Sequence, residues 1–581
     1  MRMRRSLSFT LTFCAVLFLL LACFSPTPTQ ANRSTSTAAA LESPTPLSSP
    51  TSMQIAQATA PVSLGTNLAG IADWSTQQPF LDVFKSGRGW LTQCAGDEPG
   101  CSGSWVTEES DKLDLDASGW VKSLPAPADP PEYTRVATLL QRDLGVPYPG
   151  GKYIVLYDGE GTIEYRFDAQ KDDAASRPGR DVINVTPSDA GIYMIITATD
   201  PRQQGNYIRN IRVVQERYES TFSQEVFNPV FLDRIRQFKT LRFMDWMRTN
   251  GSNQSSWANR PQVTDAFYSS DKGAPLEVMI DLANRLNADA WFNMPHKATD
   301  EYMSNFAKMV QTRLKPNLKA YVELSNEVWN WQFPQAHYAL EQGRSRWNQE
   351  GDAFMQWYGM RTAQMATIWK QVFGAQRDRL ITVMGTQTAW RGLEDPALNC
   401  PLWVKEGNRP CYQNEVDALA IAGYFGNSFG SGQNQATVES WLKDSDGGFA
   451  KAFTQLEQGS LIPHDGYDDS LQGIADSFRY YKQVTQAKGL QMIAYEGGQH
   501  LVNAENEPLT NFFLAINRRP EMKALYSQLL DSWKQAGGSL FMNFSDIGRP
   551  GKWGSWGVLE DVAQERSPKY DALVEFIERN S

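Results

Sequence analysis

Two glutamates, each at the end of a short apolar segment, carry the clearest chemical signal in this sequence. Glu327 ends the run YVELSNE over residues 321–327, and Glu496 follows the run IAY over residues 493–495. If both segments are strands of one parallel barrel, the two carboxylates lie at its carboxyl-terminal face, where such barrels carry out their chemistry. A carboxylate pair can cleave a glycosidic bond, because one protonates the leaving oxygen while the other attacks the anomeric carbon or activates water. Each glutamate alone is better explained by a surface loop or a structural ion pair, so the hypothesis depends on the pair.

The elements that must position these glutamates alternate between strands and helices. Strands are expected at residues 62–68, 240–246, 288–294, 318–325, 380–385, 418–424, 491–495 and 539–544. Helices are expected at residues 230–237, 275–286, 301–314, 335–372, 471–487, 521–536 and 569–579. Eight alternating units predict an α/β fold with a (β/α)8 TIM barrel. An open doubly wound sheet is the alternative, but no Gly-x-Gly-x-x-Gly turn opens it.

One part of the chain interrupts this alternation. Strands without intervening helices are expected at residues 152–157, 162–167, 181–185, 191–197 and 207–215. They indicate a β-sandwich-like domain inserted between the first and second barrel strands. The predicted organisation is an export signal (1–31), a Ser/Thr/Pro-rich linker (32–60), the first barrel strand with the segment after it (61–90), the inserted β-rich domain (91–225), and the rest of the catalytic barrel (226–581).

These motifs resemble clan A of the glycoside hydrolases, the retaining (β/α)8 enzymes that include cellulase-like family 5. The resemblance covers the barrel and rests on the pair Asn326-Glu327 at the fourth strand and on Glu496 at the seventh. It implies that Glu327 is the acid/base and Glu496 the nucleophile. It also implies that Asn326 bonds the 2-hydroxyl of the sugar, that Arg242 keeps the nucleophile ionised, and that Tyr424 orients it.

Two positions depart from the family 5 pattern. Ala422 stands where that family has a His, and Phe544 stands where a Trp floor is usual, so Trp553 or Trp556 is expected to supply the ring. Aromatic rings suit a sugar site because the C–H faces of sugars stack on them. The further substrate-binding candidates are Asn293, His296, Trp329, Trp331, Trp553 and Trp556. A structural role explains His296 equally well. Glu323 is expected to be a buried ion-pair partner, and Trp291 to belong to the core.

Composition narrows the classes of function. The chain has 581 residues, of which 41% are hydrophobic and 21% charged, so most of it can form a folded core. The net charge of −10 argues against non-specific nucleic-acid binding. The four His residues argue against a multi-histidine metal cage, and the two-carboxylate mechanism requires no metal and no cofactor.

The amino terminus and the cysteines both indicate export. Three Arg within residues 1–5 and an apolar run over residues 9–24 are typical of a signal peptide. Cleavage before a lipidated Cys23 and cleavage after Ala31 remain alternatives, and an uncleaved membrane anchor is a third. The pairs Cys94/Cys101 and Cys400/Cys411 are expected to form local disulfides in an oxidising compartment, with a zinc site as the rival. The expected location is therefore periplasmic, extracellular or tethered to a membrane at the amino terminus.

Together these patterns predict a secreted or lipid-anchored retaining β-glycosidase that hydrolyses a β-linked glycan, cellulase-like or exopolysaccharide-degrading, by double displacement. The expected partner is a polysaccharide or oligosaccharide. A non-catalytic carbohydrate-binding protein of the cell surface and a transglycosylase are the alternatives. The sugar, the linkage, endo or exo action, the role of the inserted domain and the oligomeric state are not determined by the sequence.

Overall fold

A computed structural model describes residues 62–128, 131–145, 148–464, 466–503 and 505–580. The predicted export signal, the linker over residues 32–60 and the candidate lipidation site Cys23 lie outside these ranges. In the part of the chain that is described, none of the helices has both the length and the apolar character that crossing a bilayer requires.

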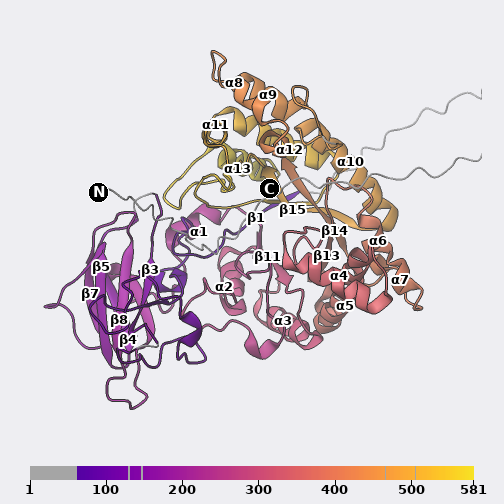
Figure 1. The fold of residues 1–581 in the computed structure, drawn as a ribbon. Helices are drawn as coiled ribbons and strands as arrows, with labels where there is room; N and C mark the ends of the chain where they lie inside the picture. Colours follow the sequence, from indigo (N-terminus) through magenta and orange to yellow (C-terminus); the bar gives the residue numbers. More distant parts are fainter. Residues whose placement is uncertain (1–61, 129–130, 146–147, 465, 504, 581) are drawn as a thin grey trace, which may run out of the picture. The chain divides into compact units, whose positions relative to one another are not determined.

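Eight parallel strands close into a barrel, as predicted (Figure 1). Around the barrel their order follows the sequence, and β1 closes the ring by pairing with both β10 and β16. The strands are β1 (Ser63–Asn67), β10 (Thr240–Arg242), β11 (Asp289–Met294), β12 (Ala320–Leu324), β13 (Leu380–Gly385), β14 (Ala418–Phe425), β15 (Gln491–Gln499) and β16 (Leu540–Asn543). Nearly every residue in them is buried, as expected where helices cover the outer surface of a parallel barrel.

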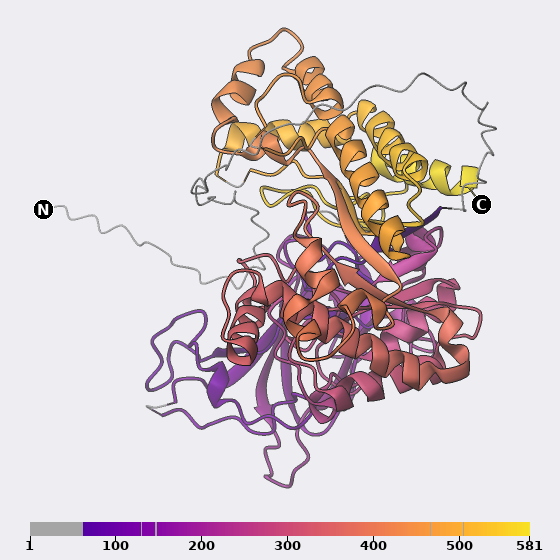
Figure 2. The same cartoon turned by 90° about the vertical axis from the view of Figure 1, so that its right-hand side faces the viewer.

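The helices that follow these strands differ in part from the prediction. They are α1 (Pro229–Ile235), α2 (Leu276–Leu286), α3 (Asp300–Arg313), α4 (Pro334–Trp347), α5 (Ala353–Phe373), α6 (Glu394–Asn399), α7 (Pro401–Val404), α8 (Gln435–Trp441), α9 (Phe449–Gln458), α10 (Leu471–Lys488), α11 (Glu507–Arg518), α12 (Glu521–Gln535) and α13 (Pro568–Asn580). The long helical region expected over residues 335–372 consists of two helices, because Asn348 adopts a left-handed backbone that ends α4 and α5 begins at Ala353. Figure 2 shows the later helices of the barrel, coloured orange to yellow. Among them, α12 packs against both α10 and α13.

The predicted insertion between the first two barrel strands is confirmed as two antiparallel four-stranded sheets. The first has the order β2-β3-β8-β5 and the second β6-β7-β4-β9. Their bounds are β2 (Leu91–Gln93), β3 (Arg135–Leu140), β4 (Gly151–Asp158), β5 (Gly161–Phe167), β6 (Ala169–Lys171), β7 (Arg180–Val185), β8 (Ile192–Thr199) and β9 (Arg209–Gln215). A shared core that includes Val136 and Met194 from one sheet and Ile183 and Val213 from the other makes this a sandwich.

Both predicted disulfides are present. Cys94 is bonded to Cys101 within the insertion, and Cys400 to Cys411 beside α5 in the barrel. Each closes a short local loop.

Candidate active site

The side chain of Arg242, at the end of β10, is fully buried. It bonds residues at the ends of both strands that were predicted to carry the catalytic glutamates. Its Nη1 donates to Glu496 Oε1 at 2.6 Å and to Asn67 Oδ1 at 2.9 Å. Its Nη2 donates to Glu323 Oε2 at 2.9 Å and to Asn326 Oδ1 at 2.9 Å. One guanidinium thus binds side chains that follow or belong to β1, β12 and β15, and the expectation of Glu323 as a buried ion-pair partner agrees with this geometry.

Glu496 is 3% exposed, and its Oε2 atom also accepts a hydrogen bond. The Tyr424 hydroxyl, from β14, donates to Glu496 Oε2 at 2.8 Å. Burial raises the pKa of Glu496 to about 8, while the Arg242 guanidinium lowers it and the nearby charge of Glu327 raises it. Burial likewise raises the pKa of Glu323. Burial is the main cause for both carboxyl groups, and the Arg242 guanidinium offsets it only in part.

Glu327 has different surroundings. It is half-buried, and each of its carboxylate oxygens accepts one hydrogen bond. The Tyr495 hydroxyl donates to Oε1 at 2.8 Å, and Asn330 Nδ2 donates to Oε2 at 3.0 Å. Glu327 has no direct bond to Arg242 among the described contacts, so this carboxylate is held by neutral donors whereas Glu496 is held by a cation.

Irregular backbone at the ends of β12 and β15 sets the directions of the Glu327, Tyr495 and Glu496 side chains. Ser325 and Glu327 have φ values of 60° and 40°, a region that costs energy for residues other than glycine. In β15 the register with β14 passes from Ala494 directly to Glu496, so Tyr495 is the extra residue of a bulge. A bulge places two consecutive side chains where regular alternation would place one. Tyr495 and Glu496 both reach the site for this reason.

The amide of Asn326 is engaged on both atoms. Besides accepting from Arg242, it donates through Nδ2 to Asn250 Oδ1 at 3.1 Å. Gln335, in the first turn of α4, donates to the same Asn250 oxygen and to the Asn326 carbonyl. This network fixes the side chain for which the resemblance implies a contact with the sugar.

Two other predicted contacts lie at the end of β11 and beyond it. Asn293 is fully buried, and its Nδ2 donates to Glu323 Oε2 and to the Ser325 carbonyl, each at 2.8 Å. His296 is 3% exposed, and neither ring nitrogen has a partner among the described residues. Its ring packs edge-on against Tyr338 at 5.1 Å, and burial lowers its pKa to about 4.

The predicted aromatic contacts separate into two groups. Trp329 is buried edge-on against Tyr495 at 6.2 Å, and Trp556 packs at 5.8 Å from the ring of Tyr424, so both adjoin the carboxylate site. Trp331 and Trp553 are instead 40% and 38% exposed. Trp556 rather than Trp553 therefore supplies a ring next to Tyr424.

Sequence reasoning missed several residues of this site, among them Asn67 at the end of β1 and Tyr495 in the bulge. Trp291, expected to be only core, is buried but also donates from Nε1 to Glu323 Oε2 at 3.0 Å. The position of Asn67 at the end of the first strand was a usable signal, whereas the bulge that turns Tyr495 inward left none.

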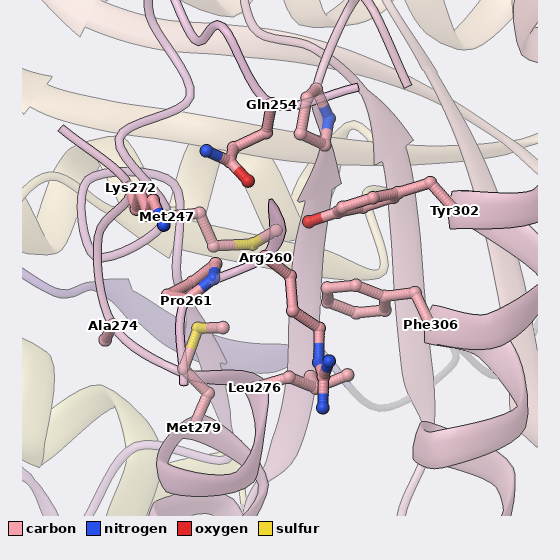
Figure 3. Close-up of a pocket in the computed structure, with 11 residues that line it drawn as sticks. Met247, Gln254, Arg260, Pro261, Lys272, Ala274, Leu276, Met279, Tyr302 and Phe306 are labelled. Carbon is pink, nitrogen blue, oxygen red and sulfur yellow. The ribbon is translucent and has the colours of Figure 1, made fainter. Parts of the chain in front are cut away.

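A separate cavity lies between the loop after β10 and the amino-terminal halves of α2 and α3 (Figure 3). Its lining includes Met247, Gln254, Arg260 and Tyr302, and the Tyr302 hydroxyl points into it in Figure 3. None of the three site glutamates lines this cavity. It therefore adds nothing to the carboxylate chemistry.

Two groups of described side chains have the composition of a metal site. In one of them, Cys94 and Cys101 with Glu132, the two cysteines are bonded to each other as a disulfide. In the other, the ligand atoms of His464, Asp468 and Asp469 lie within 4.8 Å of one another. Asp469 already accepts from the Ser428 amide and hydroxyl, and the His464 ring contacts the Gly459 carbonyl. These polar atoms are thus engaged within the fold, whereas His464 Nδ1 is buried without a partner among the described residues.

Among known proteins, the chain matches solved structures only. No model of a known protein family and no curated protein matches the chain. Solved structures that match include an endo-1,4-beta-xylanase from Caldicellulosiruptor owensensis (11% identity, 60% of this chain and 92% of that chain, TM-score 0.34) and a GH5-4 broad specificity endoglucanase from Clostridium acetobutylicum (11%, 60% and 89%, 0.32). An endo-beta-1,4-mannanase from Thermotoga petrophila matches at 13% identity over 60% of this chain and 72% of its own, with a TM-score of 0.32. These values are too low to transfer an activity.

The Arg242 network leads to a stability prediction. Arg242→Met leaves Glu323 and Glu496 buried without their cation, so we expect it to lower the free energy of unfolding by about 3–5 kcal/mol in denaturant titrations. The control is Arg518→Met, which breaks the more exposed pair with Glu560 and should cost about 1 kcal/mol or less.

A triple variant keeps this test informative if Arg242→Met alone does not fold. Adding Glu323→Gln and Glu496→Gln removes both unpaired charges and should recover most of the lost stability. A cost for Arg242→Met no larger than that of the surface control would contradict the network.

Proposed function

We propose that this protein is an exported retaining β-glycosidase that hydrolyses a β-linked glycan by double displacement. The observation that carries the proposal is the unlike environment of two carboxylates at the carboxyl-terminal ends of two barrel strands. Glu496 is held by Arg242 and a tyrosine, and Glu327 is half-buried and bound by two neutral donors. Paired carboxyl groups with different surroundings divide the roles of acid and nucleophile.

In the first step the Glu496 carboxylate attacks the anomeric carbon of the sugar. The bond to the leaving oxygen breaks as Glu327 transfers its proton to that oxygen, and a covalent glycosyl-enzyme forms. Glu327, now a carboxylate, takes a proton from water, and the resulting hydroxide attacks the same carbon. The bond to Glu496 breaks, and the sugar leaves with its original anomeric configuration.

The surrounding side chains have roles that follow from their contacts. Arg242 and Tyr424 both donate to Glu496, which favours the ionised form and fixes the direction of attack. The amide of Asn326 is held by Arg242 and Asn250, which fixes its orientation for a contact with the sugar. Trp556 beside Tyr424 offers a ring face to the sugar.

The direct test is hydrolysis of a panel of β-glucans, mannans and xylans by the mature protein. We expect at least one polymer to be cleaved, and Glu496→Ala and Glu327→Ala to lower the rate by about 10²-fold or more. Glu575→Ala, on the outer helix α13, is the matched carboxylate control and should keep full activity. Proton NMR of the first product should show retention. Inactivity of the wild type on every glycan, full activity in both site variants, or inversion would each reject the proposal.

The raised pKa of Glu496 predicts a pH dependence that can be isolated from acid catalysis. An activated 2-fluoroglycoside of the cleaved sugar has a leaving group that departs without a proton, so labelling requires only an ionised Glu496. Because burial raises the pKa of Glu496 to about 8, the labelling rate should rise with pH to a midpoint near 8.

Glu327→Gln tests in which direction Glu327 shifts the pKa of Glu496. Glu327 raises the pKa of Glu496 by like-charge repulsion, so a neutral glutamine should move the labelling midpoint to lower pH. The label is followed by mass spectrometry of the intact protein. A midpoint that is unchanged or moves upward would show that the two carboxyl groups do not interact.

Tyr495→Phe tests the bulged residue. The substitution removes a hydrogen bond to the Glu327 carboxylate, and such charge-assisted bonds contribute about 1.5–3 kcal/mol, so we expect kcat/KM to fall roughly tenfold or more. The fall should be larger for a poor leaving group than for an activated one, because Glu327 assists only the former. Tyr153→Phe removes a buried hydroxyl in the inserted domain and is the control. An equal loss on both substrates would assign Tyr495 a merely structural role.

A further inference from the structure

The inserted domain carries three near-parallel aromatic rings, here called the aromatic platform: Trp105, Phe167 and Tyr193. Trp105 and Phe167 are 53% and 49% exposed, whereas Tyr193 is buried. The ring centroids of Trp105 and Phe167 are 6.1 Å apart with an interplanar angle of 16°. Tyr193 lies 4.9 Å from Phe167 and 5.1 Å from Trp105, at 22° and 33°. Two exposed rings are thus held nearly parallel by a third.

The backbone holds Phe167 on the outer face of its sheet. Alternation in β5 assigns Phe167 to the inner face, with Ile163 and Tyr165, which both pack in the core between the sheets. Phe167 has a φ of 61°, which is an outlier for a bulky residue, and its ring stacks on Tyr193 instead. Tyr193 belongs to the outer face, because its neighbours Ile192 and Met194 belong to the inner core.

Trp105 is held by two constraints. Its carbonyl accepts from Gln93 Nε2 at 2.7 Å, and the Gln93 side-chain oxygen accepts from the Tyr193 hydroxyl. The disulfide between Cys94 and Cys101 closes the loop just before Trp105. The platform is therefore fixed in place before any ligand arrives.

The charges around the platform are paired. Arg142 lies 5.7 Å from the centre of the Phe167 ring and is paired with Asp143. On the same outer face Arg166 pairs with Glu164, and Arg135 pairs with Glu98. Flat apolar faces with polar groups at their margin and little net charge fit an uncharged ligand that has both C–H faces and hydroxyl groups.

The platform is connected to the end of the barrel that carries the carboxylates. The Arg142 amide donates to the Asp73 carbonyl at 3.0 Å, and Arg549 Nη1 donates to the Asp143 carbonyl at 2.5 Å. Asp73 follows β1, and Arg549 follows β16 in the loop that also holds Trp553 and Trp556. Both segments leave the barrel at the carboxyl-terminal ends of their strands.

We propose that the aromatic platform is an accessory binding surface for a neutral polysaccharide chain, the same polymer that the barrel cleaves. This inference rests on the proposed function. Sugar rings stack on Trp105 and Phe167, and the polar groups at the margin bond their hydroxyls. A chain bound there is kept close to the carboxylate end of the barrel, which raises the local concentration of cleavable bonds.

The test separates polymer binding from cleavage. In the Glu496→Ala background, Trp105→Ala with Phe167→Ala should weaken retention on the insoluble form of the cleaved polymer about tenfold. In the active enzyme the same pair should lower hydrolysis of the polymer by a similar factor and leave kcat/KM for a short oligosaccharide unchanged. Trp105→Phe with Phe167→Tyr keeps both rings and should keep binding, and Val404→Ala on α7 is the exposed apolar control.

The outcomes distinguish the two proposals. Polymer binding that is unaffected by the alanine pair, an equal loss on the short substrate, or a loss in the ring-keeping pair would overturn the platform. So would a change from dimer to monomer in the alanine pair, measured by sedimentation, because the rings would then serve self-association. Binding that depends on the platform in a wild type that cleaves none of the glycans would support the platform and reject the hydrolase proposal.

Discussion

The site depends on one buried positive charge shared among acidic groups. Arg242 is the single cation in direct contact with Glu323 and Glu496 in the described structure, and both carboxylates are almost inaccessible to water. Removing charges from water is costly, so the arrangement persists only because each guanidinium nitrogen has well-placed acceptors. Asn67 and Asn326 supply the remaining ones. The partners of Arg242 come from β1, β12 and β15, so this one cation connects strands on different sides of the barrel.

The same constraint explains where the chain departs from regular geometry. Left-handed backbone at Ser325 and Glu327 and the bulge at Tyr495 lie at the two strand ends that carry the paired carboxylates. Such departures are costly and are retained where a particular side-chain direction matters. Tyr495 has a double effect, since its hydroxyl binds Glu327 while its ring lies 5.3 Å from the Arg242 guanidinium. The bulge thus links Glu327 to Glu496 through two side chains, Tyr495 and Arg242.

Much of this was accessible from the sequence, and the rest was not for identifiable reasons. Strand–helix alternation predicted the barrel, and the ends of two strands indicated Glu327 and Glu496, because position along a barrel strand determines which end a residue occupies. Arg242 and Tyr424 were implied only by the resemblance to clan A. Tyr495 was missed because alternation places it opposite Glu496, and a bulge has no reliable sequence pattern. Helices α6, α7, α8, α9 and α11 were missed. Of these, α8 and α9 lie in a stretch interrupted by Gly, Ser and Asn, whereas α11 follows β15.

Tryptophan content illustrates why exposure, rather than composition, separates core from binding surface. Trp246, Trp369 and Trp533 are wholly buried, and Trp246 packs among phenylalanines. Trp105 is exposed yet held from two sides, by the Cys94–Cys101 loop and by Tyr193. Exposure of a large ring is ordinary when the ring stands alone, but two rings fixed parallel at the surface expose apolar area that folding could have buried. That arrangement, joined to the carboxylate end of the barrel through Arg142 and Asp143, is what makes the insertion more than a structural addition to the first loop.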